Sequence, residues 1–263
     1  MRFPVRLRVA VVALAAIVVA CSSDSSVAPS TNQTTTLSQV LSEMTLPAVS
    51  GVASTLSSAP VTSAATPVPS TCSYSASSQS FSCPTVTMGG LTITQSYTLL
   101  DASGKPQSQF DPNTTAAVRT TMSGAGTLTL TGFNTGGSLT IDQQQDMTLS
   151  GLLIGTHVLN GTMTMHMSGA MSTGTTTTPV NSTMTMTTTN LVLPTAHTGA
   201  TAWPTSGTIT EDMTTALDAG FPAAPIHMTM TFNGTSKVAV VITIGTSTQR
   251  CTMDLANPGM ACA

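Results

Sequence analysis

Threonine recurs at every second position over long stretches of this chain, and this alternation limits the fold more than any other feature. Residues 162–167 read Thr-Met-Thr-Met-His-Met, and residues 183–187 read Thr-Met-Thr-Met-Thr. Threonine is β-branched and favours extended backbone over helix. Successive side chains of a strand point to opposite faces, so such alternation gives a strand one apolar and one polar side. Together with 20 Gly and 15 Pro to supply turns, the pattern predicts an all-β protein.

The alternation continues through most of residues 71–263, which are expected to form a single β domain. Leu91, Ile93, Tyr97 and Leu99 alternate with polar residues, as in a sheet that is wet on one side. No repeat of fixed period indicates a propeller or solenoid. The predicted architecture is a long antiparallel meander forming a curved sheet or a partly open barrel. Residues 171–182 and 194–206, which are rich in Thr, Gly or Pro, are expected to be loops.

Two Asn-Gly pairs predict hairpins. At Asn160-Gly161 a two-residue loop would pair Val158 with Met163 and keep the apolar residues on one face. At Asn233-Gly234 a three-residue loop over 232–234 would instead pair Met228 with Val238 and Ile226 with Val240. A one-residue slip in this second register would mix the two faces. The segment 238–244, with Val or Ile at every second position, is expected to be among the best-buried strands.

The N-terminal segment has the order of parts of an export signal. Basic residues at Arg2, Arg6 and Arg8 precede an apolar run over 9–20, which ends in Val-Ala before Cys21. A membrane-spanning helix needs roughly 20 apolar residues, so this run is too short for one. Segment 1–20 resembles a bacterial lipoprotein signal peptide with a lipobox. That resemblance implies cleavage before Cys21 and lipid attachment to its sulfur, whereas an ordinary signal peptide with a coincidental cysteine is the alternative.

The same resemblance implies a location. The residue after the cysteine is Ser22 rather than the Asp that retains lipoproteins at the inner membrane. We therefore expect a cell-envelope protein sorted to the outer membrane, with the membrane as its partner through the lipid on Cys21.

The next two segments are expected to connect the anchor to the β domain. Residues 21–35 are polar and predict a flexible tether. Residues 36–70 predict a short helical segment followed by a Pro-rich connector, because Leu37, Val40, Leu41 and Met44 fall at i, i+3, i+4 and i+7. So short a helix is marginal alone, so it should lie against the sheet or plug one end of it.

The charge pattern excludes some partners. Residues 21–263 carry four basic residues against ten acidic ones, a formal charge of −6. Proteins bind nucleic acid largely by neutralising phosphates with Lys and Arg, and four scattered cations cannot form such a patch. Electrostatic docking on anionic lipid is excluded for the same reason.

Four cysteines remain besides Cys21, and they fit an exported protein. Four cysteines allow three pairings, and we favour the local ones, Cys72 with Cys83 and Cys251 with Cys262. Each pair brackets a plausible hairpin. A zinc site is disfavoured because no short C-x₂-C spacing occurs.

The most unusual feature of the composition is its methionine content, with 16 residues. The candidate ligand-binding residues are those that share strand faces: Met163, Met165, Met167, Met228 and Met230. The plainest interpretation is a packed core, since methionine fills irregular apolar spaces. The same residues could form an adaptable groove for a lipid-like ligand, and thioethers could also hold Cu(I).

The remaining polar residues do not indicate a catalytic site. In the predicted 160–161 hairpin, His157 and His166 would be neighbours on the polar face, but no third ligand lies near them, so no metal is predicted. Glu211-Asp212 and the pair Asp142 and Asp146 are interpreted as solubilising charges beside strands, with paired carboxylates or Ca²⁺ ligands as the alternative. No nucleophile elbow, H-E-x-x-H, Walker loop or dinucleotide fingerprint occurs. We expect neither enzymatic activity nor a cofactor.

The sequence therefore predicts a lipid-anchored envelope lipoprotein whose concave apolar face holds a hydrophobic ligand or a partner segment. The alternative is a structural or adhesive surface lipoprotein without a ligand cavity, in which the Thr-rich faces form the interaction surface.

Overall fold

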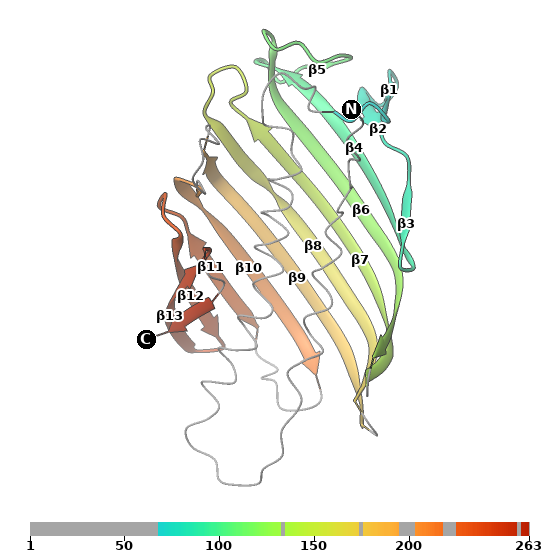
Figure 1. The fold of residues 1–263 in the computed structure, drawn as a ribbon, viewed down its shortest axis with the longest axis vertical. Helices are drawn as coiled ribbons and strands as arrows, with labels where there is room; N and C mark the ends of the chain where they lie inside the picture. The colour runs from blue at the N-terminus through green and yellow to red at the C-terminus, as the bar shows by residue number, and fades with distance from the viewer. Residues whose placement is uncertain are drawn as a thin grey trace, which may run out of the picture.

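The computed structural model describes residues 68–132, 135–173, 176–194, 203–217, 225–256 and 259–262. These residues form one antiparallel sheet with 14 strands and no helix, as the alternation predicts (Figure 1). The strands are β1 (Ser73–Ser75), β2 (Ser80–Ser82), β3 (Val86–Met88), β4 (Leu91–Asp101), β5 (Pro106–Gln107), β6 (Thr115–Gly132), β7 (Thr135–Ser150), β8 (His157–Thr173), β9 (Thr176–Leu193), β10 (Ser206–Leu217), β11 (Ile226–Thr231), β12 (Lys237–Ile244), β13 (Ser247–Asp254) and β14 (Gly259–Cys262).

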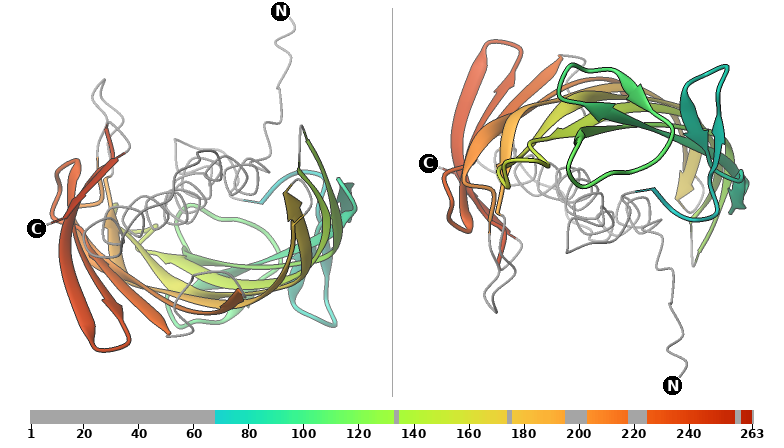
Figure 2. Two further views of the ribbon diagram at one scale, coloured as in Figure 1. Left: turned by 90° about the horizontal axis from the view of Figure 1, so that it is seen from below. Right: turned by 90° about the horizontal axis from the view of Figure 1, so that it is seen from above.

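The sheet is a meander in which strands consecutive in sequence are neighbours in space. Its hydrogen-bonded order runs from β1 to β14, with the short strands β3 and β5 paired to β4 beside the main path. The order begins at one edge and ends at the other, so the sheet is not closed, and Figure 2 shows its strong curvature. The predicted curved meander is confirmed. The predicted helical segment over 36–70 falls almost entirely outside the described residues.

The two faces of the sheet differ as the alternation requires. One face, called the inner face below, carries the buried apolar side chains, and the other carries mainly threonine and serine. The buried core of the inner face extends from β7 to β13 and includes the following residues: Met147, Leu159, Met186, Leu191, Ile209, Met228, Met230, Val238, Val240, Ile242 and Met253.

A β-bulge in β9 keeps the apolar residues on the inner face along the whole strand. Between Leu191 and Thr188, β9 contains one residue more than β8 opposite it, and the pairing with β10 shifts at the same place. Asn190 is the bulged residue, with a φ of 48° that asparagine tolerates better than most residues. As a result even-numbered residues face inward up to Thr188, and odd-numbered residues from Leu191 onward.

The predicted hairpin at Asn160-Gly161 is wrong, because both residues lie inside β8. The side-chain oxygen Oδ1 of Asn160 accepts a hydrogen bond from the Asn190 N–H at 2.7 Å, so this asparagine supports the bulge. Gly161 has a φ of 153°, and a Cβ built there would lie 2.2 Å from the Asp146 carbonyl oxygen on β7. The Asn-Gly pair therefore lies within a strand, where it allows close contact with the neighbouring strands, and does not form a turn.

The second hairpin is correct in its faces and wrong in its register. Gly234 has the expected left-handed φ of 83°. The loop is longer than predicted, since Asn233 Oδ1 accepts from the N–H of Thr235 and β12 begins only at Lys237. Met228 therefore pairs with Ile242 rather than with Val238. Because the shift is an even number of residues, the faces are unchanged, and Val238, Val240 and Ile242 are at most 1% exposed, as expected for a buried strand.

The predicted loop over 171–182 is also wrong, since β8 extends to Thr173 and β9 begins at Thr176. Pro179 lies within β9 opposite Ala170 of β8. A proline within a strand requires a position at which its nitrogen need not donate a ladder hydrogen bond.

The two local disulfides predicted from the spacing are present, Cys72–Cys83 and Cys251–Cys262. The first connects the segments that flank the β1–β2 hairpin. The second joins directly opposite residues of β13 and β14 and fastens the last strand to the sheet.

The geometry at Gly161 predicts a specific loss of stability. Gly161→Ala should lower the free energy of unfolding by about 3 kcal/mol, because its Cβ would overlap backbone atoms of β7 and the positive φ disfavours a side chain. Urea unfolding followed by circular dichroism measures this change. Gly124→Ala is the control, since its Cβ would meet only the Ile93 side chain at 3.9 Å, and it should change stability by less than about 1 kcal/mol. Equal effects of the two substitutions would contradict the proposed role of Gly161.

Candidate functional site

Methionines from four adjacent strands gather on the inner face. Cross-strand pairing places Met163 opposite Met186, and Met165 opposite Met184. Further along the sheet, Met213 lies opposite Met184, and Met228 and Met230 follow on β11. We call these residues, with Met167, the methionine face: Met163, Met165, Met167, Met184, Met186, Met213, Met228 and Met230. All five predicted ligand-binding methionines belong to it.

Glu211 lies in the middle of the methionine face. It is directly opposite Met186 on one side and Met228 on the other, and it is only 4% exposed. Burial, and to a smaller extent the charge of Asp212, raises the pKa of its carboxyl group to about 7. The carboxylate oxygen Oε2 is buried and has no hydrogen-bond partner.

The interpretation of Glu211 as a solubilising surface charge is therefore wrong. The sequence contained a usable signal, because Ile209, Glu211 and Met213 occupy alternate positions and so share a face. The neighbouring Asp212 does lie on the exposed face, where its Oδ1 is 2.7 Å from Nδ1 of His227. Asp146 is likewise on the outer face, paired with Arg119.

Two further buried polar atoms without partners accompany Glu211. They are Oγ1 of Thr188 and Nδ1 of His157, and desolvation lowers the pKa of His157. Thr188 is a diagonal neighbour of Glu211 across β9 and β10, and His157 begins β8 opposite Leu193. The cross-strand register places all three orphan atoms, the complete set among the described residues, on the inner face.

A buried polar atom without a partner typically costs about 1–3 kcal/mol, so native proteins keep few of them. No hydrogen-bond partner for these three atoms lies among the described residues. Chemically, the arrangement offers a deformable apolar surface with one acidic group and one hydroxyl near its centre. Such a surface can hold an apolar molecule and bind a hydrogen-bond donor at one point of it.

The histidine pair considered from the sequence is not formed. His157 lies on the inner face, whereas His166 pairs with Asp142 and Thr183 and lies on the outer face. The error follows from the incorrect hairpin at Asn160-Gly161. Within the described ranges, no group of three or more His, Cys, Asp or Glu side chains could hold a metal ion.

The outer face is lined by hydroxyl groups, some of which bond to each other across strands. Examples are Thr94 with Ser123 at 2.7 Å and Ser96 with Thr121 at 2.6 Å. These four residues also line an open hollow of about 720 Å³. This face therefore offers a broad polar surface.

The predicted lipidation site, Cys21, lies outside the described residues. In the part of the chain that the structure does describe, there is no helix with the length and hydropathy to cross a bilayer. Comparison with known proteins found no matching family model, no similar curated protein and no similar solved structure.

The raised pKa of Glu211 predicts how stability depends on pH. A carboxyl whose pKa is about 7 in the folded state and about 4.5 when unfolded stabilises the protein at low pH, and this contribution is lost as the pH rises from about 4.5 through 7. Glu211→Gln cannot ionise, so the variant should lose about 3 kcal/mol less than the parent between pH 4 and pH 8.

Urea unfolding at several pH values measures this difference. Asp142→Asn is the matched control, because Asp142 is an exposed carboxylate on the outer face of β7, and it should leave the pH dependence almost unchanged. A Glu211→Gln variant with the same pH dependence as the parent would contradict the burial of an ionisable carboxyl.

Proposed function

We propose that this protein is a lipid-anchored lipoprotein of the bacterial cell envelope whose inner face holds an apolar ligand carrying a hydrogen-bond donor. The observation that supports this most strongly is the cluster of unsatisfied polar atoms at Glu211 and Thr188 within the methionine face. The described residues form a single sheet, so no second sheet from the described part of the chain packs on its inner face. The lipobox at Cys21 supports the anchor.

The residue types indicate the class of ligand. Methionine is unbranched and polarizable, so a methionine-lined surface adapts to chains of different shape. The buried carboxyl of Glu211 favours a ligand head that donates a hydrogen bond, such as a hydroxyl or a protonated amine. A negatively charged head would be repelled once Glu211 ionises.

A competing candidate for this face is a stretch of the same chain. Residues 36–56 carry an apolar stripe at helical spacing, including Leu41 and Met44, and the sequence predicts that this helix lies against the sheet or plugs one end of it. A ligand and this stretch could exclude each other, so a binding experiment has to distinguish them.

A second candidate function is adhesion through the outer face. Rows of threonine and serine, hydrogen-bonded in pairs such as Thr94 with Ser123, favour a polar partner such as a carbohydrate surface. This function needs the lipid anchor but no ligand on the inner face.

Ligand binding can be tested with the full chain and the apolar fluorescent probe N-phenyl-1-naphthylamine. At pH 8 we expect saturable binding, with dodecylamine displacing the probe at least tenfold more effectively than dodecanoate. Glu211→Gln should remove this preference, whereas Asp142→Asn should keep it. Probe binding that becomes measurable only after Leu41→Ser and Met44→Ser would assign the face to residues 36–56, and no binding to any variant would exclude a ligand on it.

The anchor requires a separate experiment. Cys21→Ser removes the sulfur that would carry the lipid, so the protein should move from the membrane fraction to the soluble fraction of the cell envelope. Ser22→Ala serves as the control and should stay with the membranes. If the Cys21→Ser protein fractionates with membranes as before, it is not anchored through this cysteine.

A further inference from the structure

Three polar side chains of β10 and β11 form a hydrogen-bonded group on the outer face. Asp212 lies directly opposite His227 in the register of the two strands, and Thr229 follows two residues after His227 on the same side of β11. Nδ1 of His227 is 2.7 Å from Oδ1 of Asp212, and Nε2 of His227 is 3.2 Å from Oγ1 of Thr229. The imidazole therefore bridges a carboxylate and a hydroxyl group.

The carboxylate decides which nitrogen of the imidazole carries the hydrogen. An ionised carboxylate only accepts hydrogen bonds, so Asp212 favours the neutral tautomer of His227 with the hydrogen on Nδ1. Nε2 then has a free lone pair, and the O–H of Thr229 donates to it. A hydroxyl next to a base that a third group orients is the arrangement that activates a nucleophile, and it is recognised by geometry rather than by sequence position.

The group is accessible from solvent. The side chain of His227 is 48% exposed and that of Asp212 is 67% exposed. Met228, between His227 and Thr229 in sequence, is buried on the inner face, so the alternation of β11 itself turns the other two outward. Asp212 comes from a different strand, which is why no linear motif indicates the group.

The side chains paired with this group are uncharged. Thr185 of β9 lies opposite Asp212, Thr243 of β12 lies opposite His227, and Val241 of β12 lies opposite Thr229. None of these three side chains ionises. At the directly paired positions, Asp212 is therefore the one charged side chain that faces the imidazole.

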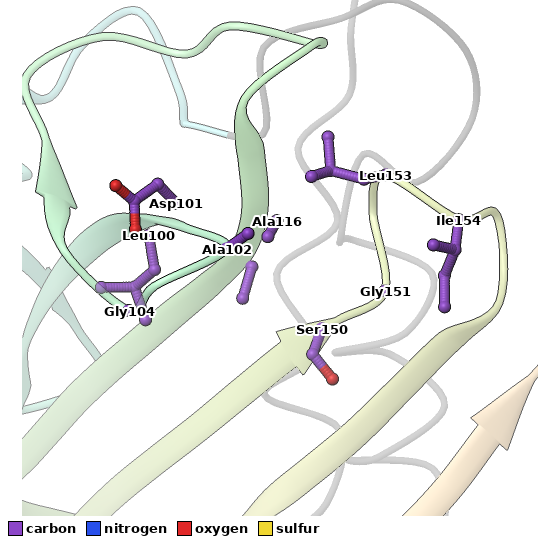
Figure 3. A pocket seen from close by; sticks show the side chains of 10 residues that line it. Leu100, Asp101, Ala102, Gly104, Ala116, Ser150, Gly151, Leu153 and Ile154 are labelled. Atoms are coloured by element: carbon purple, nitrogen blue, oxygen red, sulfur yellow. The ribbon is translucent and has the colours of Figure 1, made fainter.

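The group lies outside the open hollows of the sheet. One hollow, of about 380 Å³, is at one end of the sheet and is lined by Leu100, Leu153 and Ile154, among others (Figure 3). The other is the hydroxyl-lined hollow beside Thr94. Because neither hollow includes Thr229, we expect this residue to select a reaction partner by its reactivity and not by its shape.

We propose that Thr229 is a nucleophile that takes an acyl group from an activated ester, with His227 as its general base and Asp212 as a positioning residue. Oγ1 of Thr229 bonds to the carbonyl carbon while its proton passes to Nε2 of His227. The bond from the carbonyl carbon to the leaving oxygen breaks, and the leaving alkoxide keeps the bonding electron pair and takes the proton from Nε2. The products are a threonine ester and a free alcohol. This reaction is independent of the apolar ligand, which would bind on the opposite face.

The probe for this reactivity is p-nitrophenyl acetate, added to the full chain at pH 8. We expect release of nitrophenol and acetylation of Thr229, located by mass spectrometry of the peptide that contains β11. Thr229→Ser keeps the hydroxyl group and should keep the acetylation. Thr229→Val keeps the shape of the side chain and should abolish it, while circular dichroism stays unchanged. Acetyl groups found on lysines alone would overturn the proposal.

A substitution of the histidine tests its role as the base. His227→Gln should slow acetylation of Thr229 about a hundredfold, the lower end of what general-base catalysis contributes. His166→Gln is the matched control, since His166 is also exposed on the outer face, and it should have no effect. Equal acetylation of the parent and His227→Gln would overturn the proposal. Nitrophenol release that depends on His227 but persists in Thr229→Val would make the imidazole the nucleophile and would also overturn it.

The positioning role of Asp212 has a spectroscopic readout. The ¹⁵N chemical shifts of an imidazole show which nitrogen carries the hydrogen, and at pH 8 we expect Nδ1 for His227. Asp212→Asn should move the hydrogen toward Nε2 and slow acetylation about tenfold or more. Asp142→Asn is the control, since Asp142 lies opposite another histidine, His166, and it should change neither quantity at His227 and Thr229. An unchanged tautomer and an unchanged rate in Asp212→Asn would overturn this role.

Discussion

The bulge at Asn190 is the feature on which the inner face depends. A strand as long as β9 can keep its apolar residues on one side only while the alternation is unbroken. Its sequence changes phase after Thr188, and one extra residue absorbs the change. Asn190 tolerates the left-handed backbone conformation, and its N–H donates a hydrogen bond to Oδ1 of Asn160 on the neighbouring strand. On the other side, Gly207 of β10 has no side chain, and a Cβ there would lie 2.4 Å from the Asn190 carbonyl oxygen.

Because the bulge keeps the apolar residues of β9 on one side, the inner face combines two properties that seldom occur together in a folded protein. It is apolar and buried, and one carboxyl oxygen of Glu211 on it has no hydrogen-bond partner. A purely structural core would gain stability from an apolar residue at this position, since an unpaired buried acid is costly. The cost of Glu211 therefore favours a role for this residue in recognition, which accounts for the methionine face and the orphan hydroxyl of Thr188 together.

Much of this architecture could be predicted from the sequence because period-two alternation is a local signal. It identified the all-β class, the shared face of Met163 and Met165, and the buried strand at Val238–Ile244, and regular spacing identified both disulfides. Contacts between strands distant in sequence could not be predicted. Asn160-Gly161 has the composition of a turn, and only the bulge at Asn190, thirty residues later, explains why the chain continues straight there. The error at this hairpin carried over to the histidine pair, while Glu211 was missed although the alternation through Ile209 and Met213 indicated its face.

The central claim is that the methionine face around Glu211 is a ligand site, and methyl NMR of the protein labelled with [¹³C-methyl]methionine tests it most directly. On titration with dodecylamine at pH 8, the account predicts that the methyl signals of Met163, Met186 and Met228 move together and saturate. The signal of Met88, on the distant strand β3, should stay in place. Signals from the methionine face that remain unchanged while the amine binds elsewhere, or does not bind, would contradict the account.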